Sequence, residues 1–117
     1  MRSGAHTPEE LETLFEDAFV VRDRHAVAGL FEEGAVLVTG ATAREARGGR
    51  EIARRTAELW ARDRTYLAAP RRVLQARDTA LVVARSAISV VRRGGDGAWR
   101  YAIALLEDDH TKGRDDT

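Results

Sequence analysis

The sequence predicts an α+β domain in which three helices of the N-terminal half pack on the concave face of one curved antiparallel sheet. Two observations predict this class. Apolar residues recur at helical spacing in the first half of the chain, and the second half holds three apolar stretches that short turns separate. The length of 117 residues suits one domain. We expect that domain to span residues 8–107, between flexible tails at 1–7 and 108–117.

The first helix begins at a capping signal. Thr7 is a suitable N-cap, Pro8 fits the first helical position, and Glu10 stands three residues after the cap. Apolar residues follow at positions 11, 14, 15, 18 and 19, which form one helical stripe. The acidic residues at 9, 12, 16 and 17 lie off that stripe.

The next elements alternate between helix and strand. Asp23 opens a second, shorter helix that turns Phe31 inward and ends at residues 33–34. Residues 35–39 are too short and too β-branched for a helix and predict a strand. Residues 40–49 contain three glycines and no apolar pattern, and predict a loop. The helical period returns over 50–63, with an inward stripe of Ile52, Thr56, Leu59 and Trp60.

The last third of the chain predicts three long strands, at 66–76, 79–93 and 98–107. Because short turns join them, neighbouring strands must run antiparallel. Pro70 should interrupt its strand or place that strand at a sheet edge.

The final strand shows two different faces. One face carries Trp99, Tyr101, Ile103 and Leu105, and we expect this bulky face to meet the helices. The opposite, alanine-rich face is flat enough to contact another sheet.

Composition excludes several classes of protein. Lys+Arg and Asp+Glu number 19 each, and the zero net charge argues against a nucleic-acid partner. No apolar run is long enough to span a membrane, and the N-terminus lacks an apolar signal core, so we expect a cytoplasmic protein without a membrane partner. The absence of cysteine and the scatter of three histidines predict no metal site, and we expect no cofactor.

Four segments together resemble the nuclear transport factor 2-like superfamily, and within it the small SnoaL-like and SgcJ-like proteins. These segments are Phe19–Phe31, Ala35–Thr39, Gly49–Ile52 and the turn and strand Asp96–Tyr101. The resemblance covers roughly residues 8–106. It implies a cone-shaped fold, a homodimer that pairs through the outer face of the sheet, and a small-molecule pocket between sheet and helices.

The catalytic groups of this superfamily are missing at the matching positions. Ketosteroid isomerases need an acidic base at the end of the first strand, and that position falls near Thr39. They also need a tyrosine on the first helix, where this chain offers Phe15 and Phe19. Arg85 could be the arginine of a limonene-epoxide hydrolase, but the last three strands hold acids only in turns. The catalytic residues are therefore unassigned.

A candidate ligand pocket can still be named. It comprises Phe15, Phe19, Thr39, Trp60, Arg85, Trp99 and Tyr101. Core packing is the alternative for the aromatic members. Arg85, expected in the middle of a strand, could face solvent, cross a dimer interface or hold an anionic ligand. Tyr101 is the best polar candidate, because a buried phenol requires a hydrogen-bond partner.

Three functions follow from this pattern. The first is a homodimer that binds a small apolar or polyketide-like molecule in its cone without chemistry. The second is an isomerase, cyclase or hydrolase of small cyclic substrates. The third is a module that serves only to dimerise. The fold by itself does not choose among them.

Overall fold

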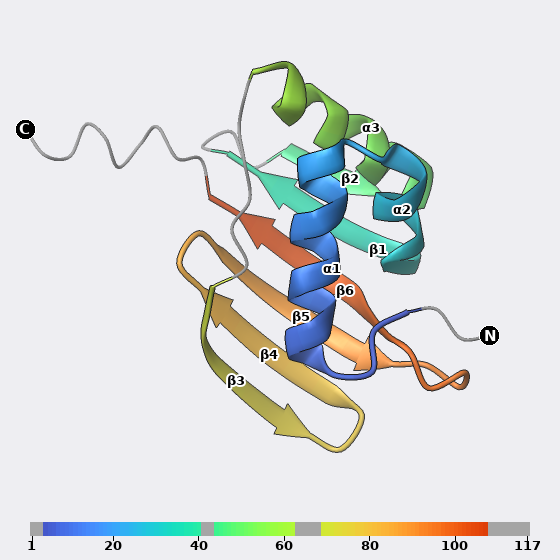
Figure 1. Cartoon of the computed structure of the whole chain (residues 1–117), viewed down its shortest axis with the longest axis vertical. Helices are drawn as coiled ribbons and strands as arrows, with labels where there is room; N and C mark the ends of the chain where they lie inside the picture. Colours follow the sequence, from blue (N-terminus) through green and yellow to red (C-terminus); the bar gives the residue numbers. More distant parts are fainter. Residues whose placement is uncertain (1–3, 41–43, 63–68, 108–117) are drawn as a thin grey trace, which may run out of the picture.

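A computed structural model describes residues 4–40, 44–62 and 69–107. It is the α+β architecture that the sequence predicts, with three helices on one face of a six-stranded sheet (Figure 1). The helices are α1 (Pro8–Val21), α2 (Arg24–Gly29) and α3 (Gly49–Ala61). The strands are β1 (Phe31–Thr39), β2 (Arg44–Arg47), β3 (Pro70–Ala76), β4 (Thr79–Ala84), β5 (Ala87–Arg93) and β6 (Trp99–Leu106). The strand order in the sheet is β2-β1-β6-β5-β4-β3.

The capping signals of the first two helices are confirmed. The Glu10 backbone N–H donates to Thr7 Oγ1 at 3.0 Å, and the Ala26 backbone N–H donates to Asp23 Oδ1 at 3.0 Å. Helix α2 is shorter than expected, because Phe31 begins strand β1 instead of ending the helix. The backbone of Phe31 belongs to the sheet, where Phe31 pairs with Tyr101 of β6.

Two features of the sheet differ from the expectation. The glycine-rich stretch 40–49 contains strand β2, which pairs antiparallel with β1 and buries Ala46. Its other residues are charged and exposed, so no apolar pattern could indicate a strand. Strand β1 pairs with β6 in parallel, which makes the sheet mixed although every other neighbouring pair among the described strands is antiparallel.

The meander has four strands where three were expected. The stretch 79–93 is a hairpin, since Arg85 and Ser86 form a turn between β4 and β5. Arg85 is therefore exposed in a turn and not in the middle of a strand. Pro70 begins β3 at the sheet edge, which confirms its expected position. Residues 66–68 of the first expected strand lie outside the described residues.

A register shift in β6 reverses the expected orientation of its second half. Val91 pairs with Tyr101, but Val90 pairs with Ile103, so Ala102 is an extra residue in the ladder. Trp99 and Tyr101 face the helices as expected, whereas Ile103 and Leu105 are 44% and 43% exposed on the outer face. The small side chain of Ala104 points inward in their place.

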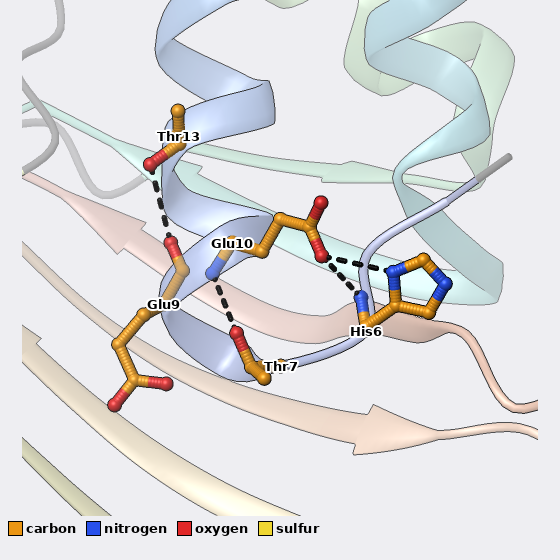
Figure 2. A network of polar contacts seen from close by, with 5 residues as sticks. All are labelled: His6, Thr7, Glu9, Glu10 and Thr13. Atoms are coloured by element: carbon orange, nitrogen blue, oxygen red, sulfur yellow. Dashed lines mark hydrogen bonds and ion pairs between the residues drawn. The ribbon is translucent and has the colours of Figure 1, made fainter.

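The N-terminal segment contacts the sheet ahead of helix α1, within the stretch 1–7 for which we expected a flexible tail. Ala5 is fully buried, and its carbonyl accepts from the Trp99 backbone N–H at 3.0 Å. Figure 2 shows how the next residues join this segment to α1: the His6 backbone N–H donates to Glu10 Oε1 at 2.7 Å. This hydrogen bond lowers the pKa of the Glu10 carboxyl. The expected tail at 108–117 lies outside the described residues.

None of the described helices is both long enough and apolar enough to cross a membrane.

Candidate functional site

Five aromatic rings meet between the helices and the sheet. Phe15 and Phe19 lie one turn apart on α1, with ring centroids 5.6 Å apart. Phe15 also contacts Phe31 of β1 at 6.0 Å and Tyr101 of β6 at 5.5 Å. Phe19 extends the cluster to Trp60 of α3 at 5.7 Å. Most of these contacts are edge-to-face, the geometry that aromatic quadrupoles favour. We call these five residues the aromatic cluster.

An acidic side chain is buried against this cluster. Glu12 is 1% exposed, and the Tyr101 hydroxyl donates to Glu12 Oε2 at 2.6 Å. Tyr101 is itself 2% exposed. A carboxyl group out of water is costly unless it is hydrogen-bonded, and a short bond from a phenol supplies part of that compensation. The expectation that a buried Tyr101 would find a hydrogen-bond partner is confirmed.

Glu12 was not among the expected site residues. Its position off the apolar stripe of α1 predicts exposure, whereas the helix buries Glu12 together with Leu11, Phe15 and Phe19. One signal could have found it. Glu12 lies three and seven residues before Phe15 and Phe19, so it shares their side of the helix. Because a buried Tyr101 needs an acceptor, a polar partner could have been expected on that side of α1.

Helix α3 contributes a different kind of polar group to the interior. Trp60 is 6% exposed, and its indole Nε1–H has no hydrogen-bond partner within the part of the chain that the structure describes. The nearby Thr56 is fully buried, but its hydroxyl donates to the Ile52 carbonyl at 2.9 Å. A buried donor without an acceptor costs about 1–3 kcal/mol, so the Trp60 N–H is an unusual group in a folded interior.

The other three expected pocket residues are not members of the aromatic cluster. Thr39 is buried at the end of β1, beside Leu106 of β6. Trp99 lies at the start of β6, where the Arg93 guanidinium is 5.5 Å from its ring centroid. Arg85 is exposed in its turn. The structure therefore brings four of the seven expected residues together: Phe15, Phe19, Trp60 and Tyr101.

The acids of the strand region lie in turns, as expected. Asp78 accepts from the Arg93 guanidinium, and Asp96 accepts from Arg100 at 2.8 Å and from the Ala98 backbone N–H at 3.1 Å. The Arg100 side chain holds the pKa of Asp96 well below its usual value. No group of three or more His, Asp or Glu residues positioned for a metal ion occurs among residues 4–40, 44–62 and 69–107.

The outer face of the sheet carries a second candidate surface. Register pairs align side chains across all six strands in two adjacent rows. Row one comprises Leu74, Leu81, Val90, Ile103, Val36 and Arg47, in order from β3 to β2. Row two comprises Arg72, Val83, Ile88, Leu105, Val38 and Glu45 in the same order. The most exposed large apolar side chains of these rows are Leu74, Ile88, Ile103 and Leu105, at 43–49%. Figure 1 shows all three helices on the opposite face.

Solved structures with this arrangement of helices and strands define the fold. A ketosteroid isomerase-like protein from Erwinia carotovora atroseptica matches with a TM-score of 0.68 and 19% identity, over 85% of this chain and 91% of that protein. A putative calcium/calmodulin-dependent protein kinase type II association domain from Thiobacillus denitrificans matches with a TM-score of 0.73 and 16% identity, over 91% and 98%. An NTF2-like protein with a cystatin-like fold from Novosphingobium aromaticivorans matches with a TM-score of 0.66 and 16% identity, over 90% and 84%.

The chain has the nuclear transport factor 2-like fold. No model of a known protein family and no curated protein sequence matches it. The expected fold class is thus confirmed, while identities of this size describe the fold and leave the activity open.

The acid and the tyrosine of the interior come from unexpected elements of this fold. The acid is on helix α1 and the tyrosine is on the last strand, whereas the resemblance led us to look for a tyrosine on the first helix and an acid on the strands. A carboxyl and a phenol joined by a hydrogen bond of 2.6 Å can also exchange a proton with a third group that comes within hydrogen-bond distance of either one. This arrangement can bind a polar substituent of an otherwise apolar molecule, or transfer a proton to it.

Proposed function

We propose that this chain binds a small, largely apolar molecule, such as a polyketide-like ring compound, in the interior between α1, α3 and the sheet, and that it does so as a homodimer. The Trp60 N–H carries the proposal of a ligand. It is buried, its ring belongs to the aromatic cluster, and it lacks an acceptor among the described residues. A ligand oxygen would satisfy it, and the surrounding rings would contact the apolar body of the ligand.

Native mass spectrometry of the purified protein tests the binding of a ligand. We expect the wild-type subunits to carry a discrete added mass that collisional activation releases. Trp60→Phe keeps an aromatic ring but removes the indole N–H, and we expect it to lower the affinity for the ligand roughly tenfold, the effect of losing one buried hydrogen bond, and so to reduce the loaded fraction. Trp99→Phe is the matched control, because it removes a buried indole outside the aromatic cluster, and it should stay loaded. Wild-type subunits without an added mass, or equal loading of both variants, would contradict the proposal.

The outer rows support the proposal of a homodimer. Apolar side chains that are exposed on β3, β5 and β6 and half-buried on β4 and β1 form a contiguous surface of the kind that marks a protein–protein interface. One of the similar structures is described as an association domain, a second reason to consider self-association for this chain. Leu105→Glu places a charge at the centre of row two and should yield monomers in analytical ultracentrifugation. Val20→Glu, a comparable change at an exposed position of α1, should leave the dimer intact.

An enzyme of the isomerase, cyclase or hydrolase type is the second candidate, and the Glu12–Tyr101 pair favours it. A carboxyl in an apolar site beside a phenol is a suitable acid–base unit. Protein loaded with its co-purified molecule should then exchange carbon-bound protons of that molecule in D₂O, and Glu12→Gln should stop the exchange. Exchange at the wild-type rate in this variant would remove Glu12 from the mechanism.

A third outcome is a protein that forms a dimer and carries no ligand. The remaining function would then be that of a module that serves only to dimerise.

A further inference from the structure

Helix α3 is attached to the sheet at its N-terminal end. The Gly48 backbone N–H donates to the Ala35 carbonyl of β1 at 2.9 Å. The Glu51 carboxylate accepts from the Arg47 backbone N–H of β2 at 3.1 Å. Ile52, in the same turn of the helix, is fully buried. Both polar and apolar contacts therefore hold the first turn of α3 in place.

The rest of the helix, residues 53–61, has no polar attachment of this kind. Thr56 Oγ1 donates to the Ile52 carbonyl at 2.9 Å, and Arg55 Nε lies 3.4 Å from Glu58 Oε1, so both contacts stay within α3. In the described chain, no side-chain hydrogen bond or ion pair joins residues 53–61 to another element. We call these residues the distal part of α3.

Apolar packing holds the distal part against the interior. Trp60 is its one large buried side chain, and Leu59 beside it is half-buried against the core. The Trp60 ring meets the Phe19 ring of α1 edge-to-face, with the centroids 5.7 Å apart. The attachment of this end of α3 therefore depends on a small apolar contact in which one indole is the largest member.

This closed position leaves two buried donors of α3 without acceptors. They are the Trp60 indole N–H and Arg55 Nη1, and no other buried side-chain donor of the described residues lacks a partner. The Arg55 side chain is only 11% exposed, and its contact with Glu58 involves Nε. A buried polar group without a partner is unfavourable, and a charged one more so. Both donors would regain hydrogen bonds to water if the distal part moved outward.

Helix α1 has the polar attachment that the distal part of α3 lacks. The Tyr101 hydroxyl of β6 donates to Glu12 Oε2 of α1 at 2.6 Å. Leu11, Phe15 and Phe19 are buried along the same helix. Polar and apolar contacts therefore fix α1 along its length, which makes it the internal reference for any movement of α3.

Two adjacent glycines lie where α3 begins. Gly48 has a φ of 84°, a backbone conformation that glycine adopts without strain. We infer that α3 is a hinged lid that pivots about Gly48–Gly49, so that its distal part moves away from the aromatic cluster and takes Trp60 with it. The purpose of the lid rests on the proposed function, because an enclosed interior must open to admit a ligand. A ligand oxygen that accepts from the Trp60 N–H would favour the closed position.

Two single-tryptophan variants test the opening of the lid. Trp99→Phe leaves Trp60 as the only indole, and Trp60→Phe leaves Trp99. The two indoles are 6% and 2% exposed, so a permanently closed structure protects both about equally from acrylamide. Both variants are unfolded and refolded beforehand to remove any bound molecule. We expect acrylamide to quench Trp60 roughly fivefold more efficiently than Trp99, and equal quenching would overturn the inference.

Hydrogen–deuterium exchange of the refolded wild-type protein is an independent measurement that needs no tryptophan variant. The amides of residues 53–61 should exchange at least roughly tenfold faster than those of residues 12–20 in α1. Arg55→Met removes the unsatisfied charge at similar side-chain length, so it should slow the exchange of the distal part roughly tenfold. Arg54→Met is the matched control, because Arg54 is exposed on the same helix and its loss should change nothing.

The outcomes separate the lid from the proposed ligand. Distal amides as protected as those of α1, or an exchange rate that Arg55→Met leaves unchanged, would contradict the lid even in a protein that carries a ligand. Rapid exchange of the distal part that Arg55→Met suppresses would establish the lid, although wild-type subunits without an added mass would still contradict the proposed ligand.

Discussion

Tyr101 and Glu12 should be energetically coupled through their hydrogen bond, and a double-mutant cycle measures that coupling. Tyr101→Phe deletes the hydroxyl and leaves a carboxyl that is 1% exposed with one donor fewer. A buried acceptor that loses its donor costs about 1–3 kcal/mol, so we expect a loss of about 2 kcal/mol in the free energy of unfolding. In a domain of this size that loss lowers Tm by roughly 8 °C.

Glu12→Gln should be less harmful. The amide retains an oxygen that can accept from the Tyr101 hydroxyl, so the contact can still form, and replacing the carboxyl by an amide should cost about 1 kcal/mol. In the double variant, Tyr101→Phe removes a donor from an amide and no longer from the carboxyl. The two effects should therefore fall short of their sum by about 1 kcal/mol.

Urea denaturation at neutral pH, followed by circular dichroism, provides the four free energies of this cycle. Glu9→Gln is the matched control, because Glu9 is an exposed acid on the same helix, and its loss should change the free energy by less than about 0.5 kcal/mol. Effects of Tyr101→Phe and Glu12→Gln that add to within about 0.3 kcal/mol would refute the reasoning, since independent sites add in this way. Such a result would mean that the 2.6 Å contact does not hold the carboxyl.

Two further predictions concern local structure. Gly49→Ala should lower the free energy of unfolding by roughly 1 kcal/mol in the same urea assay, because a Cβ there would lie 3.3 Å from the Ala28 carbonyl oxygen. Gly29→Ala is the control: a Cβ at Gly29 meets nothing within 4 Å, so this variant should be neutral or slightly stabilising. The Asp96 carboxyl, followed by carbon-detected NMR, should titrate below the usual range for aspartate, and Arg100→Gln should move its midpoint upward. A lowered pKa means that this ion pair stabilises the fold at neutral pH and loses its effect only as acid protonates Asp96, so a midpoint unchanged by Arg100→Gln would contradict the assignment.

The sequence predicts the elements with strong local signals and misses those that tertiary contacts create. Thr7 and Asp23 cap their helices as expected because capping depends only on residues within one turn. Strand β2 could not be predicted, since three of its four residues are charged and only its pairing with β1 makes it a strand. The turn at Arg85 was missed for a related reason: without Gly, Pro, Asn or Asp, nothing local distinguishes it from a continuing strand.

The candidate site was predictable in part. Four of the expected aromatic side chains meet in the structure. They come from elements with clear apolar periodicity, so their inward orientation follows from the pattern. The burial of Glu12 does not follow from the pattern, because a hydrophobic stripe is defined by apolar residues and every acid is then assigned to the exposed side. Its burial depends on Tyr101, 89 residues later in the chain. No local pattern contains that information.

The departures from the expected pattern coincide with the surfaces to which a function is proposed. Glu12 is a polar residue on the buried side of its helix, and Trp60 is a buried donor that the described chain leaves unsatisfied. Ile103 and Leu105 are large apolar residues that the register shift turns toward solvent. In a monomer without a ligand each of these arrangements costs free energy, and a sequence shaped by stability alone would avoid them. A bound molecule in the interior and a second copy on the outer face would remove the costs at Trp60 and at the outer rows. The two proposed partners would therefore account for features that packing among the described residues does not explain.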